Sequence, residues 1–155
     1  MSHLVDITPS AEEQIEFHKI RELLAGYARG AFGHEACLKL HPMSDITDIQ
    51  YRLDQVYEYS EISALSERPQ LSAYEDVAES LDHLAIDGYV LPQEDIHEIG
   101  RQMEQVKLIH QFFSKPDTRR DYPEIFQWTL LAADPANLIK PIRAILDEKG
   151  EVRPN

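Results

Sequence analysis

Apolar residues recur at steps of three and four along much of the chain, which is the spacing of one face of an α-helix. The clearest runs predict two long helices, one from Ser44 or Asp45 to about Glu67 and one from Pro92 to just before Pro116. At about 20 residues each, these helices would be ~30 Å long. Their apolar stripes consist of Ile46, Ile49, Leu53 and Val56 in the first helix and of Ile96, Ile99, Met103, Val106, Ile109 and Phe113 in the second.

Shorter apolar runs predict five further helices. Gly100 lies inside the second long helix and indicates a close packing contact there. Pro141 is placed before the last short helix, because proline inside a helix removes a backbone hydrogen bond. Residues 148–150 then form a turn into a short extended tail. The five short helices span residues 11 or 16 to 28, 31 to 40, about 74 to a turn at 87–88, 122 to about 132, and 142 to 147.

The sequence contains no alternating strand pattern, no repeat and no low-complexity segment, so the predicted fold class is all-α. We expect a helical bundle in which the two long helices pack antiparallel, with several short helices around one end and a short turn and extended tail at the C-terminus. A length of 155 residues suits one domain or one piece of a larger domain. We expect an N-terminal extension over residues 1–14 and a helical core segment over residues 15–155.

The chain is strongly acidic, with a formal net charge of −13. Nucleic-acid binding draws most of its affinity from lysine and arginine side chains that neutralise phosphates. A single basic cluster, formed by Lys115, Arg119 and Arg120, faces Asp117 and Asp121. Direct DNA binding by this segment is therefore disfavoured.

Neither a membrane segment nor a leader is indicated. No apolar run approaches the ~18–20 residues that cross a bilayer, and residues 1–6 lack the basic start and apolar stretch of a signal peptide. The one cysteine, Cys37, has no partner for an internal disulfide, which fits a reducing compartment. We expect a cytoplasmic protein without a membrane partner.

The known signatures of nucleotide and nucleophile chemistry are missing. The sequence has no Gly-x-x-x-x-Gly-Lys-Ser/Thr loop, no Gly-x-Gly-x-x-Gly motif, no nucleophile elbow and no Cys-x-x-Cys pair. We therefore assign no catalytic, cofactor-binding or metal-binding residue, and we expect no enzymatic activity and no cofactor in this segment.

Two patterns that contain histidine are candidates for metal binding. Glu94 and His97 have the i, i+3 spacing of di-iron helical bundles, but such a site needs a second Glu-x-x-His and two more glutamates. No second copy exists, and both side chains flank the apolar stripe, so we expect them to point to solvent. His34 and His41 bracket the second helix without a third ligand, which favours surface histidines over zinc.

Cys37 and three tyrosines have ordinary structural interpretations. Cys37 lies on an apolar helix face, where a small core residue is commoner than a reactive thiol. The tyrosines could form a base-stacking platform, but tyrosines of a long helix more often lie at the boundary of the core. The acids beside them, Glu58 included, are interpreted as solvated surface. The three tyrosines are Tyr51, Tyr57 and Tyr59.

Four short segments, in this order, resemble one protein family. They are Ile15-Glu16-Phe17-His18-Lys19-Ile20, Leu40-His41-Pro42-Met43-Ser44-Asp45, Gly88-Tyr89-Val90-Leu91, and Asp147 with Gly150, Glu151 and Val152. Their order and separation are similar to the N-terminal region of the MutS-homologue DNA-repair ATPases, in the branch that has a C-terminal Smr nuclease domain and no mismatch-recognition domain. The sequence departs from the family pattern at Ile15, His18, Met43 and Pro154.

The resemblance implies a non-catalytic core and lever segment of a longer chain. The parent would be an ATPase and DNA endonuclease that uses ATP and Mg and acts in DNA repair, recombination suppression or ribosome rescue. Its partners would be the remaining domains of the parent, a second copy in a homodimer, and DNA or ribosomes held by other domains. No catalytic residue is carried over, since the nucleotide-binding and nuclease motifs of the family lie outside these residues.

Two alternatives remain beside this interpretation. The first is a free-standing acidic helical module that binds a protein partner, and the second is a metalloenzyme built around Glu94 and His97. If the chain is a fragment, the apolar stripes of both long helices should be only half covered. Exposed apolar patches recruit partners, so we expect the fragment to self-associate as a symmetric dimer.

Overall fold

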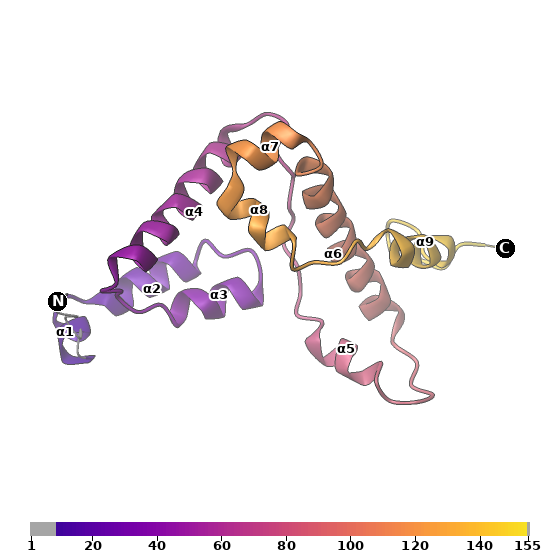
Figure 1. Cartoon of the computed structure of the whole chain (residues 1–155). Coiled ribbons are helices and arrows are strands. Elements are labelled where there is room, and N and C mark those ends of the chain that lie inside the picture. Colours follow the sequence, from indigo (N-terminus) through magenta and orange to yellow (C-terminus); the bar gives the residue numbers. More distant parts are fainter. Residues whose placement is uncertain (1–8, 155) are drawn as a thin grey trace.

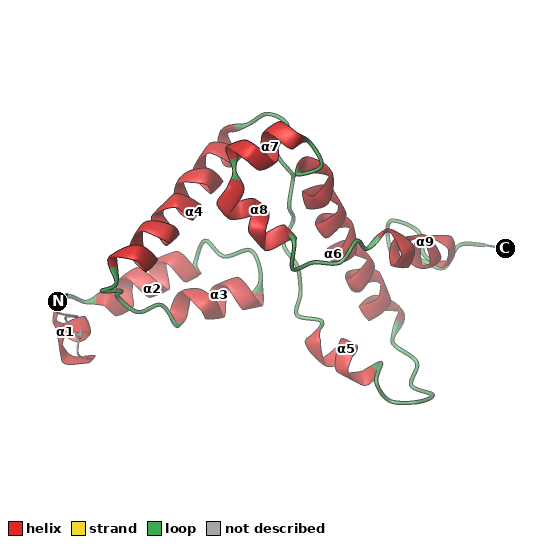
Figure 2. Ribbon diagram, in the orientation of Figure 1, coloured by secondary structure: helices red, strands yellow, loops and turns green. Residues whose placement is uncertain are grey.

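The computed structural model describes residues 9–154, and within that range it contains nine helices and no β-strand (Figures 1 and 2). The all-α prediction is confirmed. Residues 1–6, the supposed position of a leader, and the first part of the expected 1–14 extension lie outside the described residues. The helices are α1 Pro9–Gln14, α2 Phe17–Ala25, α3 Ala31–Leu38, α4 Ile46–Ala64, α5 Ala78–His83, α6 Gln93–Phe112, α7 Pro116–Asp121, α8 Pro123–Thr129 and α9 Ala136–Ile145.

The starts of both long helices follow their predicted signals. Asp45, one of the two predicted caps, accepts hydrogen bonds from the backbone N–H groups of Thr47 and Asp48 at 2.8 and 3.1 Å. These bonds satisfy two of the backbone donors that every helix leaves unpaired at its N-terminus. Pro92 precedes the first residue of α6, within one residue of its expected place.

The first predicted helix is two helices. Glu16 has a φ of 55°, a left-handed conformation that interrupts the hydrogen-bond ladder between α1 and α2. Both proposed starts, near residues 11 and 16, are therefore close to real helix starts. The second of the two helices ends at Ala25 rather than at residue 28.

Of the two proline interpretations at helix ends, the one for Pro116 is confirmed and the one for Pro141 is wrong. Pro116 follows the end of α6, as expected, but it also begins α7, a helix that the apolar pattern did not reveal. Pro141 lies inside α9 instead of in front of it. The helix begins earlier because the Asp134 carboxylate accepts a hydrogen bond from the backbone N–H of Ala136 at 3.0 Å, and Pro141 removes only one bond from the ladder that follows.

The two long helices do not form the antiparallel pair that we expected. They converge at their C-terminal ends, and their N-terminal ends lie far apart (Figure 1). Tyr59 and Ile62 of α4 line a pocket together with Ile109 and Phe113 at the end of α6 and just beyond it. The reason is the connection at residues 65–77, the return segment. It turns at residues 66–68 and then runs extended, back along α6, so that both long helices run toward the same end (Figure 1).

Apolar packing is concentrated around α6. A small core cluster joins Val77, Leu91 and Ile99. Gly100 is buried against α9, where an added Cβ would lie 3.0 Å from Cγ2 of Ile142, so the predicted close contact at this glycine is confirmed. The expected C-terminal turn and tail are present too, with an antiparallel bridge between Leu146 and Val152.

The buried face of α4 is largely polar. Gln55, Glu58 and Ile62 lie on one side of this helix and are its buried residues. The Glu58 carboxylate accepts hydrogen bonds from the backbone N–H groups of Glu124 and Ile125, at 3.1 and 2.8 Å, and thereby caps the N-terminus of α8. The interpretation of Glu58 as solvated surface is wrong, because α8 begins after Tyr122 and has no capping side chain of its own.

We predict that Glu58→Leu lowers the free energy of unfolding by about 1–3 kcal/mol, because two partly buried N–H groups lose their acceptor. Urea denaturation measures this change. The matched control is Glu61→Leu, three residues further along α4 at an exposed position, for which we expect about 0.5 kcal/mol or less. Equal effects of the two substitutions would contradict the capping role.

Candidate interaction surface

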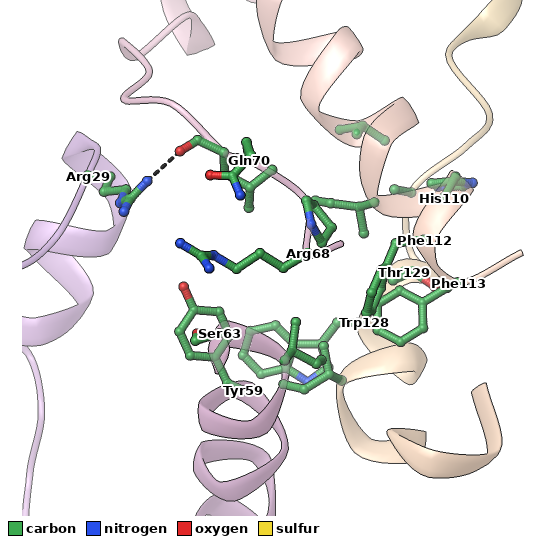
Figure 3. Close-up of a pocket in the computed structure, with 17 residues that line it drawn as sticks. Arg29, Tyr59, Ser63, Arg68, Gln70, His110, Phe112, Phe113, Trp128 and Thr129 are labelled. Carbon is green, nitrogen blue, oxygen red and sulfur yellow. Dashed lines mark hydrogen bonds between the residues drawn. The ribbon is translucent and has the colours of Figure 1, made fainter. Parts of the chain in front are cut away.

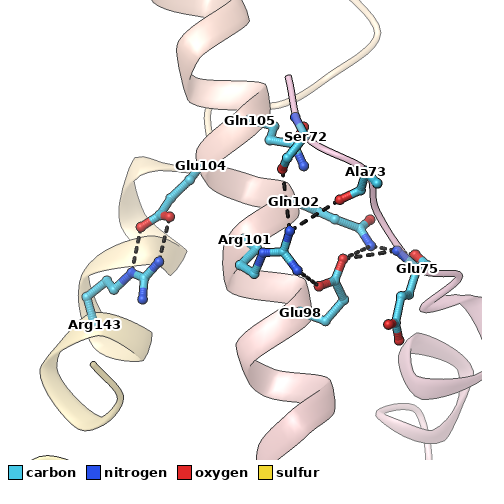
Figure 4. Close-up of polar contacts among 9 residues, drawn as sticks. All are labelled: Ser72, Ala73, Glu75, Glu98, Arg101, Gln102, Glu104, Gln105 and Arg143. Atoms are coloured by element: carbon cyan, nitrogen blue, oxygen red, sulfur yellow. Dashed lines mark hydrogen bonds and ion pairs between the residues drawn. The ribbon is translucent and has the colours of Figure 1, made fainter. Parts of the chain in front are cut away.

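Helix α6 holds the return segment through polar side chains (Figure 4). The buried Glu98 accepts a hydrogen bond from the backbone N–H of Glu75 at 3.1 Å and forms an ion pair with Arg101 at 2.8 Å. Gln102 donates to the Glu75 carbonyl at 2.7 Å, and Gln105 accepts from the backbone N–H of Ser72 at 2.9 Å. An extended segment has no hydrogen bonds of its own, so these side chains fix its course.

The opposite flank of α6 holds α9 through one ion pair. Arg143 donates two hydrogen bonds of 2.5 Å to the carboxylate of Glu104 (Figure 4). The guanidinium hydrogen bond keeps the pKa of Glu104 below its ordinary value of 4.5, and the same bond raises the pKa of Arg143. The pair therefore stabilises the attachment of α9 at every pH at which Glu104 is ionised.

The return segment also anchors the α2–α3 pair. Arg29 donates a hydrogen bond to the carbonyl oxygen of Leu71, and Tyr74 forms a parallel bridge with Gly30. The Tyr74 ring lies where a side chain at residue 30 would project, since an added Cβ would be 2.3 Å from it. A larger residue at position 30 would force the Tyr74 ring to move.

The segments that carry the family resemblance shape helix boundaries. Glu16 forms the break before α2, and Asp45 caps α4. Gly88, with a φ of 79°, makes the turn that places Leu91 in the core. The Asp147 carboxylate accepts hydrogen bonds from the backbone N–H groups of residues 149 and 151 and closes the C-terminal turn, and these bonds lower its pKa. These motif residues have an evident structural role.

The apolar stripe of α4 faces away from the protein. Ile46, Leu53 and Val56 are 81%, 56% and 66% exposed, whereas Ile49 is partly buried. The expectation of a half-covered stripe is confirmed for α4. The stripe of α6 is covered more completely than that of α4 but is not fully buried. Ile99 is buried, whereas Ile96, Met103 and Val106 are partly buried.

A pocket of about 490 Å³ opens where the two long helices converge (Figure 3). One wall is apolar and includes Ile62, Ile109, Phe112, Phe113 and Trp128. At the other end the guanidinium groups of Arg29 and Arg68 lie near Gln70 and the hydroxyl of Tyr59, as the close-up shows. Sequence reasoning missed this pocket, because its lining comes from segments that only the return connection brings together.

The basic cluster is largely engaged by the protein itself. Lys115 pairs with Glu67 at 2.9 Å, and Arg120 pairs with Asp117 and Asp121 at 3.0 Å each. Arg119 donates to the Ser114 carbonyl oxygen and lies over the Phe126 ring. The predicted neutralisation of this cluster by nearby acids is confirmed.

The candidate metal-binding residues lie at separate places in the structure. His97 is not directed to solvent as expected; it packs against Gly150, and its Nδ1 is buried, whereas Glu94 is exposed. His41 contacts Glu12, and His34 is exposed. Nowhere in residues 9–154 do three or more potential ligands of the His, Cys, Asp and Glu types come together in a group that could hold a metal.

The remaining candidates have structural surroundings as well. Cys37 is a free, half-buried thiol on α3. Tyr57 and Tyr59 are 67% and 60% exposed, more than a position at the core boundary implies, and Tyr51 is 39% exposed. No helix among the described residues is both long enough and apolar enough to cross a bilayer.

These observations define an all-α segment with an exposed apolar surface on α4. The putative endonuclease MutS2 of Bacillus subtilis (strain 168) is 30% identical over 139 residues, which cover 89% of this chain and 18% of that protein. Endonuclease MutS2 of Latilactobacillus sakei is 31% identical over 72% of this chain and 14% of its own length. The chain is thus a MutS2-like segment, and its resemblance to the MutS family is confirmed.

The chain spans less than a fifth of the curated relatives it matches. No family model matches it. No solved structure matches it either.

We predict that the coupling between Glu104 and Arg143 depends on pH. Since the folded pKa of Glu104 is depressed, the stabilisation is fully present above pH 4.5 and is lost as the pH falls through the lower folded value. A double-mutant cycle with Glu104→Gln and Arg143→Gln should give about 1 kcal/mol of coupling at neutral pH, because both groups keep contact with water. Urea denaturation at several pH values measures it, and a coupling that is constant into strong acid would contradict the ion pair.

Proposed function

We propose that this chain is a non-catalytic core segment of a longer MutS2-like DNA-processing protein. The observation that carries the proposal is the similarity of nine-tenths of the chain to less than a fifth of relatives named endonuclease MutS2. The structural roles of the motif residues support it, since they cap helices and form turns. In this proposal other parts of the parent hold ATP with Mg, the nuclease site of the Smr domain, and DNA or ribosomes.

The domain assignment is part of the proposal. Residues 15–155 act as the core and lever segment, and the stripe of Ile46, Leu53 and Val56 on α4 packs against helices that the parent supplies. A helix that exposes its apolar stripe while it buries glutamine and glutamate on the opposite side is suited to two neighbours. Helix α8 is the first, and the parent supplies the second. The parent acts in the cytoplasm as a homodimer, in DNA repair and recombination suppression or in ribosome rescue.

A domain replacement tests this framework role. We expect this chain to replace the 139 aligned residues of the Bacillus subtilis relative and to preserve nuclease activity within about tenfold, because a framework transmits position rather than chemistry. Deletion of the same residues should abolish the activity, which is measured by nicking of plasmid DNA. The isolated chain should show neither ATP hydrolysis nor DNA cleavage. Activity that copurifies with the isolated chain would overturn the proposal, as would an inactive but folded chimera.

Self-association of the isolated chain tests the exposed stripe. We predict a dimer that the double substitution Leu53→Ser with Val56→Ser weakens by about tenfold, as expected for apolar residues at the centre of an interface. The free energy of unfolding should change by only about 0.5 kcal/mol, since both residues are exposed. Sedimentation velocity measures the dissociation constant.

The matched control for this prediction is Val90→Ser with Leu131→Ser. These two residues are 84% and 89% exposed but lie outside α4, so their substitution should leave the dimer intact. A strict monomer at high concentration that binds little hydrophobic dye would contradict the prediction and favour a self-contained interaction module.

A further inference from the structure

The pocket at the convergence of α4 and α6 differs from the rest of the molecule in charge. Acids account for 28 of the 155 residues, yet none of the described residues that line this pocket is an aspartate or a glutamate. Two arginines and one histidine are among them instead. In a chain with a net charge of −13, this is a local reversal of sign.

The two arginines have no carboxylate partner among the described residues. Arg68 donates one long hydrogen bond of 3.4 Å to the Leu65 carbonyl oxygen, and Arg29 donates to the carbonyl oxygen of Leu71. Glu67, the acid next to Arg68 in sequence, forms an ion pair with Lys115 at 2.9 Å, and that hydrogen bond lowers its pKa. Arg68 therefore keeps most of its donors free, and its guanidinium reaches across the pocket mouth (Figure 3).

The other end of the pocket is aromatic and largely apolar. The rings of Phe112 and Phe113 meet edge to face with their centroids 5.0 Å apart, and Phe113 is 5% exposed. Trp128 is 52% exposed and presents its indole to the pocket. His110, also in the lining, has a buried Nε2 atom without a hydrogen-bond partner.

The volume and lining fit a small molecule. Ligand pockets in proteins hold roughly 300–1,000 Å³ and combine an apolar lining with a few polar groups that fix orientation, and this pocket of about 490 Å³ has that composition. We propose that it binds a small amphipathic anion, with an aromatic body against Trp128 and Phe112 and a carboxylate or phosphate group at Arg68 and Arg29. Binding at this site does not require the proposed framework function.

The charge preference can be measured with two probes of the same shape, 2-naphthoate and the neutral 2-naphthamide. Trp128 is the only tryptophan in the chain, so its indole N–H gives a single NMR signal that reports on the pocket. We expect both probes to shift this signal and naphthoate to bind about tenfold more tightly, because hydrogen bonds to charged groups are the stronger ones.

Substitutions assign the preference to the arginine. Arg68 is exposed, so Arg68→Gln should leave the fold intact; we expect it to weaken naphthoate binding about fivefold and to leave naphthamide binding unchanged. Arg68→Lys should restore part of the preference through its charge. The matched control is Arg153→Gln in the C-terminal tail, where the guanidinium donates to the Leu146 carbonyl oxygen, and it should change neither affinity.

Three results would overturn the proposal. The first is equal affinity of the wild-type chain for naphthoate and naphthamide, or no binding of either. The second is an indole signal of Trp128 that does not move at saturation, which would place the probe elsewhere, for example on the α4 stripe. The third is an equal loss of affinity for both probes in Arg68→Gln, which would show that the substitution changes the shape of the pocket rather than removing a charge contact.

Discussion

The course of the chain between the two long helices depends on one requirement, namely that the backbone polar groups of the extended return segment find hydrogen-bond partners. A helix satisfies these groups internally, whereas an extended segment without a neighbouring strand cannot. Here the polar side of α6 supplies the partners, with Glu98 and Gln105 as acceptors and Gln102 as a donor. The return segment leaves the C-terminal end of α4 and lies alongside α6, and the chain then turns and enters α6 from its far end (Figure 1). The two long helices therefore meet at their C-terminal ends. The α2–α3 pair, the pocket and the position of α8 all follow from that arrangement.

Several buried positions on the long helices are occupied by polar side chains, where many small domains have leucine. Glu58 and Glu98 are 7% and 8% exposed; Glu58 accepts hydrogen bonds from two backbone N–H groups of α8, and Glu98 accepts one from the backbone N–H of Glu75. Buried carboxylates are stable only when such bonds replace water. Because polar residues occupy the inner side of α4, its apolar stripe lies on the opposite side and remains exposed to solvent. A chain that uses its inner surfaces for polar connections and leaves apolar side chains outside is suited to a position between neighbours, which is the physical basis of the proposed framework role.

Sequence patterns located most of the helices, but not α7 and not the arrangement of the helices in space. The stripe spacing, Asp45 and Pro92 were sufficient for α4 and α6, because caps and periodicity act within one or two helical turns. The direction of α6 relative to α4 depends on bonds between residues such as Glu75 and Glu98, which no local pattern reveals. Glu58 was misinterpreted for the same reason, although Tyr122-Pro123 offered a clue: a helix that begins with proline after a residue that cannot cap needs an acceptor from elsewhere. The pocket escaped detection because residues from four separate segments line it, among them Arg29, Arg68 and Trp128.

The stripe and the pocket are adjacent on α4, and this adjacency has a consequence for binding. Val56 and Tyr59 are three residues apart and so lie on the same side of the helix, which means that the stripe leads toward the mouth of the pocket. A neighbour that covers the stripe would approach Tyr59 and Arg68. An anion held by Arg68 would then face that neighbour, so each binding event would change the affinity for the other by the same factor, as thermodynamic linkage requires. The sign of the coupling would depend on the neighbour: an acidic helix would compete with the anion for Arg68, and a neutral one would enclose the pocket and strengthen the binding of both.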